Sequence, residues 1–230
     1  MRSIGYRCSM SSNETRSSQE RPAVPPASRK YAGELVTHVR IYNSIITMFF
    51  FGGRGKLDRA LVEKSGASAG HQVLDVGAGP GFLVRQLAER VGPQGRVVGL
   101  DPSEPMVRYA AKKSRRTPNC EFRVGYAQSV DAPDGAYDVV TTTFAMHHLP
   151  EEERIPTVAE LYRVVRPGGR LLIADLHPQE RTAYGRRRAA VMQAIDPRRY
   201  VEPLHELGSE DVEFTFFKPW TGCVVAVKPA

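Results

Sequence analysis

Glycines and an acidic residue lie close together in one short run, Asp75-Val76-Gly77-Ala78-Gly79-Pro80-Gly81-Phe82. The run follows a buried strand expected over residues 72–76 and opens a helix expected over residues 82–91. Glycine lets the backbone turn sharply and come close to a ligand, and the unpaired N–H groups at a helix start favour a negatively charged group. We therefore expect residues 77–81, which we call the glycine loop, to bind a ligand. We also expect Asp75 to brace this loop through hydrogen bonds from the loop's backbone N–H groups.

A second acidic residue, Asp101, stands twenty residues beyond Gly81, at the end of a strand expected over residues 96–100. In doubly wound α/β folds, a carboxylate at this place can accept hydrogen bonds from both hydroxyls of a ribose. The glycine spacing differs from that of dinucleotide-binding proteins. Their fingerprint G-x-G-x-x-G would need a glycine at position 82, where this chain has Phe82. The spacing therefore argues against a nicotinamide-dependent reductase.

Two adjacent histidines, His147 and His148, follow a strand expected over residues 137–143. The carboxyl end of such a strand lies at the rim of the sheet where ligands bind, and histidine is suited to take a proton there. One interpretation makes His147 or His148 the base that deprotonates a substrate. The other gives both histidines only hydrogen bonds to the backbone or a capping role at the next helix. The sequence leaves both interpretations open.

The elements that must position these residues alternate between helix and strand along the chain. Further helices are expected over residues 35–46, 56–64, 104–114, 151–165 and 182–195, and further strands over residues 121–124, 170–175, 213–217 and 223–227. Alternation of this kind implies a parallel sheet with helices on both faces. We expect the helix over 151–165 to end at Pro167-Gly168-Gly169. The last two strands are expected to form a hairpin with its turn at Pro219-Trp220-Thr221-Gly222.

Together these residues resemble the class I S-adenosylmethionine-dependent methyltransferases. The resemblance rests on the pattern D-x-G-x-G-x-G, on the acidic residue that ends the next strand, and on a third run. That run, Tyr162-Arg163-Val164-Val165-Arg166-Pro167-Gly168-Gly169-Arg170-Leu171, is similar to the helix–turn–strand signature before the family's fifth strand. The implied fold is α/β, a doubly wound and mostly parallel seven-stranded sheet of the Rossmann-like kind that ends in an antiparallel C-terminal hairpin.

The resemblance implies a methyltransferase that uses S-adenosyl-L-methionine as its cofactor. The glycine loop would hold the methionine portion and Asp101 the ribose, while Tyr126 stands where the family often has an aspartate that meets the adenine. The cofactor-binding residues implied in this way are Asp75, Gly77, Ala78, Gly79, Gly81, Asp101, Pro102, Met106, Tyr126, Ala127, Thr143 and Phe144. The catalytic candidates are His147 and His148, and no metal site is expected.

The N-terminal part is loosely similar to the start of the ubiquinone/menaquinone-biosynthesis C-methyltransferases, in which a tyrosine-containing helix and a glycine-rich turn precede the cofactor domain. The resemblance would place Tyr42 over the active site, and the apolar run over residues 45–51 could line a pocket for a lipophilic acceptor. That family carries an Arg-Asn pair where this chain has its two histidines. The expected substrate-binding residues are Tyr42, Phe51, His148 and Tyr184.

The expected methyl acceptor is a small, aromatic or lipophilic molecule methylated at carbon or oxygen. Nucleic acid is disfavoured, because the run Thr142-Thr143-Phe144-Ala145 lacks the Asn/Asp-Pro-Pro-aromatic loop of methyltransferases that act on DNA-base amines. Two alternatives stay open. In the first, the acceptor is RNA or protein, docked by the basic tail over residues 1–27 and by the arginine-rich helix expected over residues 182–195. In the second, the chain is a non-catalytic partner subunit that binds the cofactor.

The chain has 230 residues and a formal net charge of +7, and its first 30 residues are rich in arginine. We expect a disordered basic tail over residues 1–27, an N-terminal helical cap over 28–68 and the methyltransferase domain over 69–230. The longest apolar run, residues 45–51, is far shorter than the roughly 20 residues that span a bilayer. A cytoplasmic enzyme is therefore expected, with an organelle transit peptide or a peripheral membrane contact as alternatives. A homodimer is compatible with the sequence.

Overall fold

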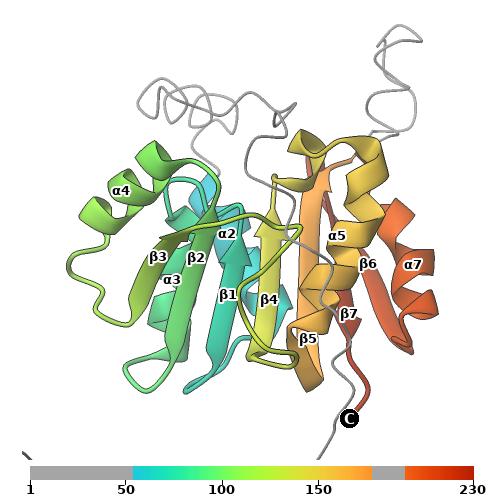
Figure 1. Ribbon diagram of the computed structural model, residues 1–230, viewed down its shortest axis with the longest axis horizontal. Coiled ribbons are helices and arrows are strands. Elements are labelled where there is room, and N and C mark those ends of the chain that lie inside the picture. The colour runs from blue at the N-terminus through green and yellow to red at the C-terminus, as the bar shows by residue number, and fades with distance from the viewer. Residues whose placement is uncertain (1–53, 178–194) are drawn as a thin grey trace, which may run out of the picture. The chain divides into compact units, whose positions relative to one another are not determined.

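The computed structural model describes residues 54–177 and 195–230 (Figure 1). Alternating helices and strands form one sheet with helices on both faces. The elements are α2 (Arg54–Ser65), β1 (Gln72–Val76), α3 (Phe82–Val91), β2 (Arg96–Asp101), α4 (Glu104–Lys113), β3 (Cys120–Val124), β4 (Tyr137–Thr143), the 3-10 turn η1 (Met146–His148), α5 (Glu151–Arg163), β5 (Val165–Leu176), the 3-10 turn η2 (Pro197–Tyr200), α7 (Val201–Glu206), β6 (Asp211–Phe217) and β7 (Thr221–Val227).

The sheet has seven strands in the order β3-β2-β1-β4-β5-β7-β6. The pairs from β3 across to β5 are parallel, and β7 is antiparallel to both of its neighbours, β5 and β6. The expected fold class, a mostly parallel seven-stranded sheet with an antiparallel C-terminal hairpin, is confirmed. Because a parallel strand is covered on both faces, β1 is buried along nearly all of its length.

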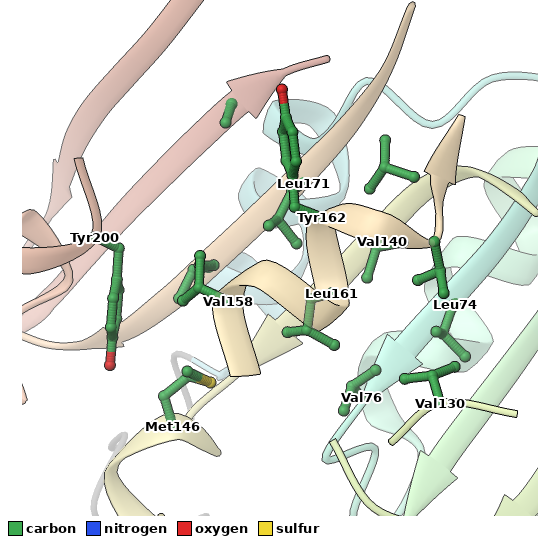
Figure 2. Close-up of a cluster of buried hydrophobic side chains, with 14 of the residues drawn as sticks. Leu74, Val76, Val130, Val140, Met146, Val158, Leu161, Tyr162, Leu171 and Tyr200 are labelled. Carbon is green, nitrogen blue, oxygen red and sulfur yellow. The ribbon is translucent and has the colours of Figure 1, made fainter. Parts of the chain in front are cut away.

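Two hydrophobic cores separate the sheet from its helices. On one face, Val158 and Leu161 of α5 pack with Leu171 of β5 and Val140 of β4, as Figure 2 shows. On the other face, Leu61 of α2 packs with α3 and with the sheet. In Figure 1, α5 lies in front of the sheet, and α2 and α3 lie behind it. The sheet is thereby held rigidly from both sides, which fixes the relative positions of the strand ends.

The structure differs from the expectation at the start of β5. The helix α5 ends at Arg163, and β5 already begins at Val165, so the expected turn at Pro167-Gly168-Gly169 lies inside the strand. The pairing of β4 with β5 slips at this point, between Tyr137 and Val139 of β4. The N–H of Gly168 donates to the carbonyl of Lys228, and the N–H of Lys228 donates to the carbonyl of Gly169. Pairing with the segment after β7 therefore holds this stretch extended.

Smaller differences concern elements at the C-terminal end. The strands β6 and β7 begin two residues earlier than expected, so Thr221 and Gly222 belong to β7 instead of the turn. The short elements η1, η2 and α7 were not predicted. The helix expected over residues 182–195 falls almost wholly outside the described residues, as does the one expected over residues 35–46. No helix among residues 54–177 and 195–230 has the length and apolar character needed to cross a membrane.

Parallel pairing brings the carboxyl ends of β1, β2, β4 and β5 to the same end of the sheet. Asp75 and Val76 of β1 pair with Gly99 and Leu100 of β2 on one side and with residues of β4 on the other. The carboxyl end of β5 joins the same edge through its parallel pairing with β4. The glycine loop, Asp101, the two histidines and the end of β5 therefore share one rim, as ligand-binding residues do in open α/β sheets.

Candidate active site

The glycine loop adopts a conformation that favours glycine at three positions. Gly77, Gly79 and Gly81 have φ angles of 74°, 50° and 75°. The N–H groups of Gly77 and Ala78 donate to the carbonyl of Leu100, at 2.8 and 3.0 Å. A Cβ built on Gly77 would overlap the Cβ of Ala145 in the segment after β4. The loop thus turns tightly between β1 and α3, and its backbone lies directly against the end of β4.

The carboxylate of Asp101 is bonded to the glycine loop. One oxygen accepts the N–H of Gly79 at 2.8 Å, and the other accepts the N–H of Ser103 at 2.9 Å. The side chain is buried, and burial raises the pKa of Asp101, while the two N–H donors oppose that rise. A carboxylate offers about four acceptor positions, and these two bonds use two of them. Asp101 can therefore fix the loop and still accept hydrogen bonds from a ligand.

Asp75 lies one residue before the end of β1 and is fully buried. Its carboxylate accepts a hydrogen bond from the hydroxyl of Thr141 on β4, at 2.7 Å. This bond ties β1 to β4 close to the rim. The N–H groups of the glycine loop donate to Leu100, Asp101 and Ala78, so the bracing role expected of Asp75 stays a prediction.

The other cofactor candidates lie around the same rim. Pro102 and Met106 flank the start of α4, where Met106 is buried and its N–H donates to the hydroxyl of Ser103. Tyr126 and Ala127 follow β3, and Tyr126 is among the exposed large side chains. At the end of β4, Thr143 is buried. The structure brings these residues to the rim without assigning them a ligand.

Phe144, directly after β4, has a left-handed backbone conformation with φ of 55°. Its N–H donates to the carbonyl of Ala174 on β5, at 2.8 Å. A non-glycine residue in this region stores strain of order 1–3 kcal/mol, and such strain clusters at ligand-binding sites. The sharp turn directs the chain from β4 into η1, which carries His147 and His148.

His147 is paired with a buried carboxylate, Asp175, near the end of β5. The ring Nδ1 of His147 lies 2.7 Å from one oxygen of Asp175, and the backbone N–H of His147 donates to the other oxygen at 3.1 Å. The side chain of Asp175 is inaccessible to solvent, whereas that of His147 is 24% exposed. Sequence reasoning missed Asp175 as a functional candidate, although an aspartate at the rim end of the apolar run Leu171-Leu172-Ile173-Ala174 is a signal of its own.

The ring of His148 lies beside that of His147, with the two ring centroids 4.1 Å apart. The pKa of His148 is lowered to about 4, mainly because its ring is removed from solvent and to a smaller extent because of the neighbouring His147. The imidazole of His148 is therefore neutral at physiological pH. Within the described part of the chain, the two histidines thus have different surroundings, since only His147 is bonded to a carboxylate.

The lowered pKa of His148 predicts a loss of stability in acid. An unfolded chain protonates His148 near pH 6.5, whereas the folded chain does so only near pH 4. The unfolded state therefore binds more protons between these values, and the contribution of His148 to stability falls as the pH falls from about 6.5 to about 4. Urea unfolding of the wild type and of His148→Gln at pH 7.5 and pH 4.5 checks this. The variant should lose less stability in acid, and equal losses would contradict the assignment.

A second buried pair, His177 and Asp196, was also missed. The Nδ1 of His177 lies 3.1 Å from Asp196, whose carboxylate also accepts two hydrogen bonds from the guanidinium of Arg198. The ring of His177 packs between Phe214 and Phe216 of β6. No local pattern points to this pair, because its members lie 19 residues apart.

Three expected substrate-binding residues, Tyr42, Phe51 and Tyr184, lie outside the described residues. His148 is the described member of that set. In the part of the chain that the structure describes, no group of three or more His, Cys, Asp or Glu side chains is arranged to hold a metal ion.

Sequence comparison identifies a domain family and named relatives that this chain resembles. A family model for a methyltransferase domain matches residues 73–169. The chain is 31% identical over 137 residues to a ubiquinone/menaquinone biosynthesis C-methyltransferase of Hydrogenovibrio crunogenus, a match that covers 58% of this chain and 53% of the relative. It is 33% identical over 145 residues to a demethylmenaquinone methyltransferase of Thermus thermophilus, covering 63% of this chain and 64% of the relative. The chain thus spans between about half and two thirds of the length of these two relatives.

Structural comparison gives the same result. A crystal structure of an S-adenosylmethionine-dependent methyltransferase from Aquifex aeolicus superposes with a TM-score of 0.62 and 26% identity, over 74% of this chain and 88% of that one. A phosphoethanolamine N-methyltransferase of Haemonchus contortus, solved with S-adenosyl-L-methionine, shares the fold with a TM-score of 0.64 at 18% identity, over 76% of this chain and 53% of that one. Residues 73–169 therefore match a methyltransferase domain, and the chain has the Rossmann-like fold of S-adenosylmethionine-dependent methyltransferases.

Proposed function

We propose that this protein transfers a methyl group from S-adenosylmethionine to a small aromatic or lipophilic molecule, at carbon or oxygen. The observation that carries the proposal is the shared rim, at which the glycine loop bonded to Asp101 and the His147–Asp175 pair lie on neighbouring strand ends. The first arrangement suits a nucleoside with a charged tail. The second suits an acceptor that must lose a proton.

The residues of the rim fit S-adenosylmethionine, which supplies a methyl group on a sulfonium centre when it is bound. The glycine loop, which has no side chain at Gly77 where its backbone lies against Ala145, would hold the methionine portion. The buried carboxylate of Asp101 would accept the ribose hydroxyls, with Pro102 and Met106 beside the nucleoside. Tyr126 and Ala127 would border the adenine, and Thr143 and Phe144 the reacting methyl group.

The acceptor is proposed from the relatives and from the rim. The relatives are named as methyltransferases of quinone biosynthesis, and a quinol is both aromatic and lipophilic. His147 or His148 would take the acceptor's proton in this function. The parts proposed for Tyr42, Phe51 and Tyr184, and the division of the chain at residues 27 and 68, remain predictions.

Two measurements on the full chain test the function. Isothermal titration calorimetry with S-adenosylmethionine should show one binding site per chain, and Asp138→Asn should bind equally well. Asp138 is a suitable control because it accepts the N–H of Gln72 at the start of β1, the end away from the rim. A screen with methyl-labelled S-adenosylmethionine against phenols, quinols, sterols and RNA should then label a hydroxylated small molecule.

Each outcome of the two measurements supports the proposed function or contradicts it. Label on a phenol or quinol supports the proposal, and label on RNA alone would replace the proposed acceptor class with nucleic acid. Binding of the cofactor without label on any acceptor would favour a partner subunit instead of an enzyme. Absence of cofactor binding would refute the proposal at its first step.

A further inference from the structure

We propose that Asp175 is a positioning residue that holds the ring of His147 with its proton on Nδ1, so that Nε2 accepts the proton of a hydroxyl on the methyl acceptor. The proposal rests on the function proposed above and deepens it in three ways. It assigns the proton acceptor to one of the two histidines, it gives Asp175 a role, and it restricts the acceptor to molecules that carry an ionisable O–H group.

The hydrogen bonds of Asp175 fix which nitrogen of His147 carries the proton. An ionised carboxylate accepts hydrogen bonds and donates none, so a ring nitrogen 2.7 Å from it must bear a hydrogen. The same carboxylate accepts the backbone N–H of His147 and that of Leu176, at 3.1 and 2.8 Å. These donors stabilise the negative charge of a side chain that has no access to solvent. Nδ1 of His147 is therefore the donor.

The remaining nitrogen of His147 is open to a substrate. Within residues 54–177 and 195–230, Nε2 has no hydrogen-bond partner, and the side chain is 24% exposed at the rim. In the neutral ring, a proton on Nδ1 leaves a lone pair on Nε2. A histidine whose Nδ1–H is held by a carboxylate has the orientation and tautomer that a general base requires.

The backbone around His147 is also fixed. Its carbonyl accepts a hydrogen bond from Arg154 of α5 at 3.4 Å, and the N–H of His148 donates to the carbonyl of Ala145 at 3.1 Å. Met146, the preceding residue, is buried in the core beside α5. Contacts from β5 and α5 therefore hold the ring at one place on the rim, and positioning of this kind is a large part of the rate enhancement of a displacement reaction.

His148 is a poorer candidate for the same task. Among the described residues, no carboxylate bonds to its ring, and its pKa is lowered to about 4, so its imidazole is a weak base at neutral pH. Among residues 54–177 and 195–230, Arg154 and Tyr200 are further titratable groups near the pair. Tyr200 stays protonated, because burial and then the charge of Asp175 raise its pKa to about 12. The geometry thus selects His147.

The chemistry restricts the acceptor. A neutral amine attacks a methyl group through its own lone pair and needs no base beforehand, whereas a hydroxyl becomes a strong nucleophile only when its proton leaves. In the proposed step, the O–H bond breaks toward Nε2, and an electron pair of the oxygen forms the new bond to the methyl carbon. The electron pair of the broken methyl–sulfur bond stays on sulfur. When a ring carbon conjugated with that oxygen attacks instead, the ring proton then passes to water, the electron pair of that C–H bond restores the aromatic ring, and the oxygen takes its proton back from Nε2.

The tautomer is tested by NMR on the full chain labelled with ¹⁵N-histidine, without any acceptor. At pH 7.5, the ring of His147, assigned by the signal that disappears in His147→Gln, should show a protonated Nδ1 and an unprotonated Nε2. In Asp175→Asn this pattern should be lost. Asp196→Asn removes the carboxylate from the other His–Asp pair, that of His177, and should leave the His147 signals unchanged. A wild-type His147 ring protonated on Nε2 alone would overturn the proposal.

A double-mutant cycle tests the positioning role during turnover. Once a labelled acceptor is found, Asp175→Asn should lower kcat at least tenfold in the wild-type background and less than about twofold in the His147→Gln background. An equal loss in both backgrounds would mean that Asp175 acts only on the fold. The label itself should appear on a hydroxylated acceptor, and transfer to amines alone would overturn the proposed step.

The two tests fail separately from the proposed function. Cofactor binding by calorimetry and methyl transfer to any small molecule report on the function, and both survive if His147 has the other tautomer. Conversely, the expected NMR pattern with no transfer to any acceptor would leave the ring geometry intact and refute the function. A shifted cofactor affinity in Asp175→Asn would show that the change has spread to the glycine loop.

Discussion

Replacement of Asp101 by alanine should weaken the binding of S-adenosylmethionine by about 10- to 100-fold. The variant loses a buried carboxylate that can accept hydrogen bonds from a ribose, and hydrogen bonds to charged groups contribute about 1.5–3 kcal/mol, which corresponds to roughly that range of affinity. It also leaves the N–H groups of Gly79 and Ser103 without their acceptor. Isothermal titration calorimetry with the wild type and the variant measures the change.

A second variant separates the ribose contact from the support of the loop. Asp101→Asn keeps one carbonyl oxygen for a backbone N–H and has nearly the same shape, so it should retain more affinity than alanine and less than the wild type. Asp138→Asn, at the other end of the sheet, should bind as tightly as the wild type. An unchanged dissociation constant for Asp101→Ala would remove Asp101 from the cofactor site.

Local sequence patterns predicted the inner part of the fold well. The strands β1 and β4 and the helix α3 have the expected bounds, because apolar runs and a glycine-marked turn specify them without help from distant residues. The parallel pairing from β3 across to β5 was expected from the alternation of helix and strand. The described residues of α2 extend the expected helix by two residues at its start and one at its end.

The start of β5 could not be predicted in the same way. Pro167-Gly168-Gly169 has the composition of a turn, and a local pattern has no information about Lys228, about 60 residues later in the chain, whose backbone pairs with both glycines. Tertiary pairing overrides turn propensity here. The short elements η2 and α7 have no periodic pattern long enough to be recognised.

The candidate site also has a part that local sequence could predict and a part that depends on strand pairing. The glycine loop and Asp101 could be found from spacing alone, since the loop is one continuous run and Asp101 ends the next strand. The bond between them, from the N–H of Gly79 to the carboxylate, depends on the parallel register of β1 and β2. The partner of His147 could not be found, because Asp175 lies 28 residues away and meets it only through the pairing of β4 with β5.

Replacement of Gly77 by alanine should reduce cofactor affinity by about a hundredfold. An alanine at φ of 74° is strained by roughly 1–2 kcal/mol, and its Cβ would overlap the Cβ of Ala145. Since the backbone of β4 and its following turn is fixed by the core, the glycine loop must move instead. A displaced loop loses backbone contacts to the charged methionine portion, and hydrogen bonds to charged groups contribute about 1.5–3 kcal/mol, or up to about a hundredfold in affinity. Calorimetric titration with S-adenosylmethionine and thermal unfolding of the same samples measure both effects.

Two further variants distinguish the overlap from the backbone strain. Gly70 also has a positive φ, of 83°, but a Cβ there has no neighbour within 4 Å. Gly70→Ala should therefore lower the melting temperature through strain alone and leave cofactor affinity unchanged. The double variant Gly77→Ala/Ala145→Gly removes the side chain that the new Cβ would meet, so it should recover a substantial part of the lost affinity. Full affinity in Gly77→Ala alone would place the cofactor away from the glycine loop, whereas a double variant as weak as the single one would assign the loss to backbone strain at residue 77.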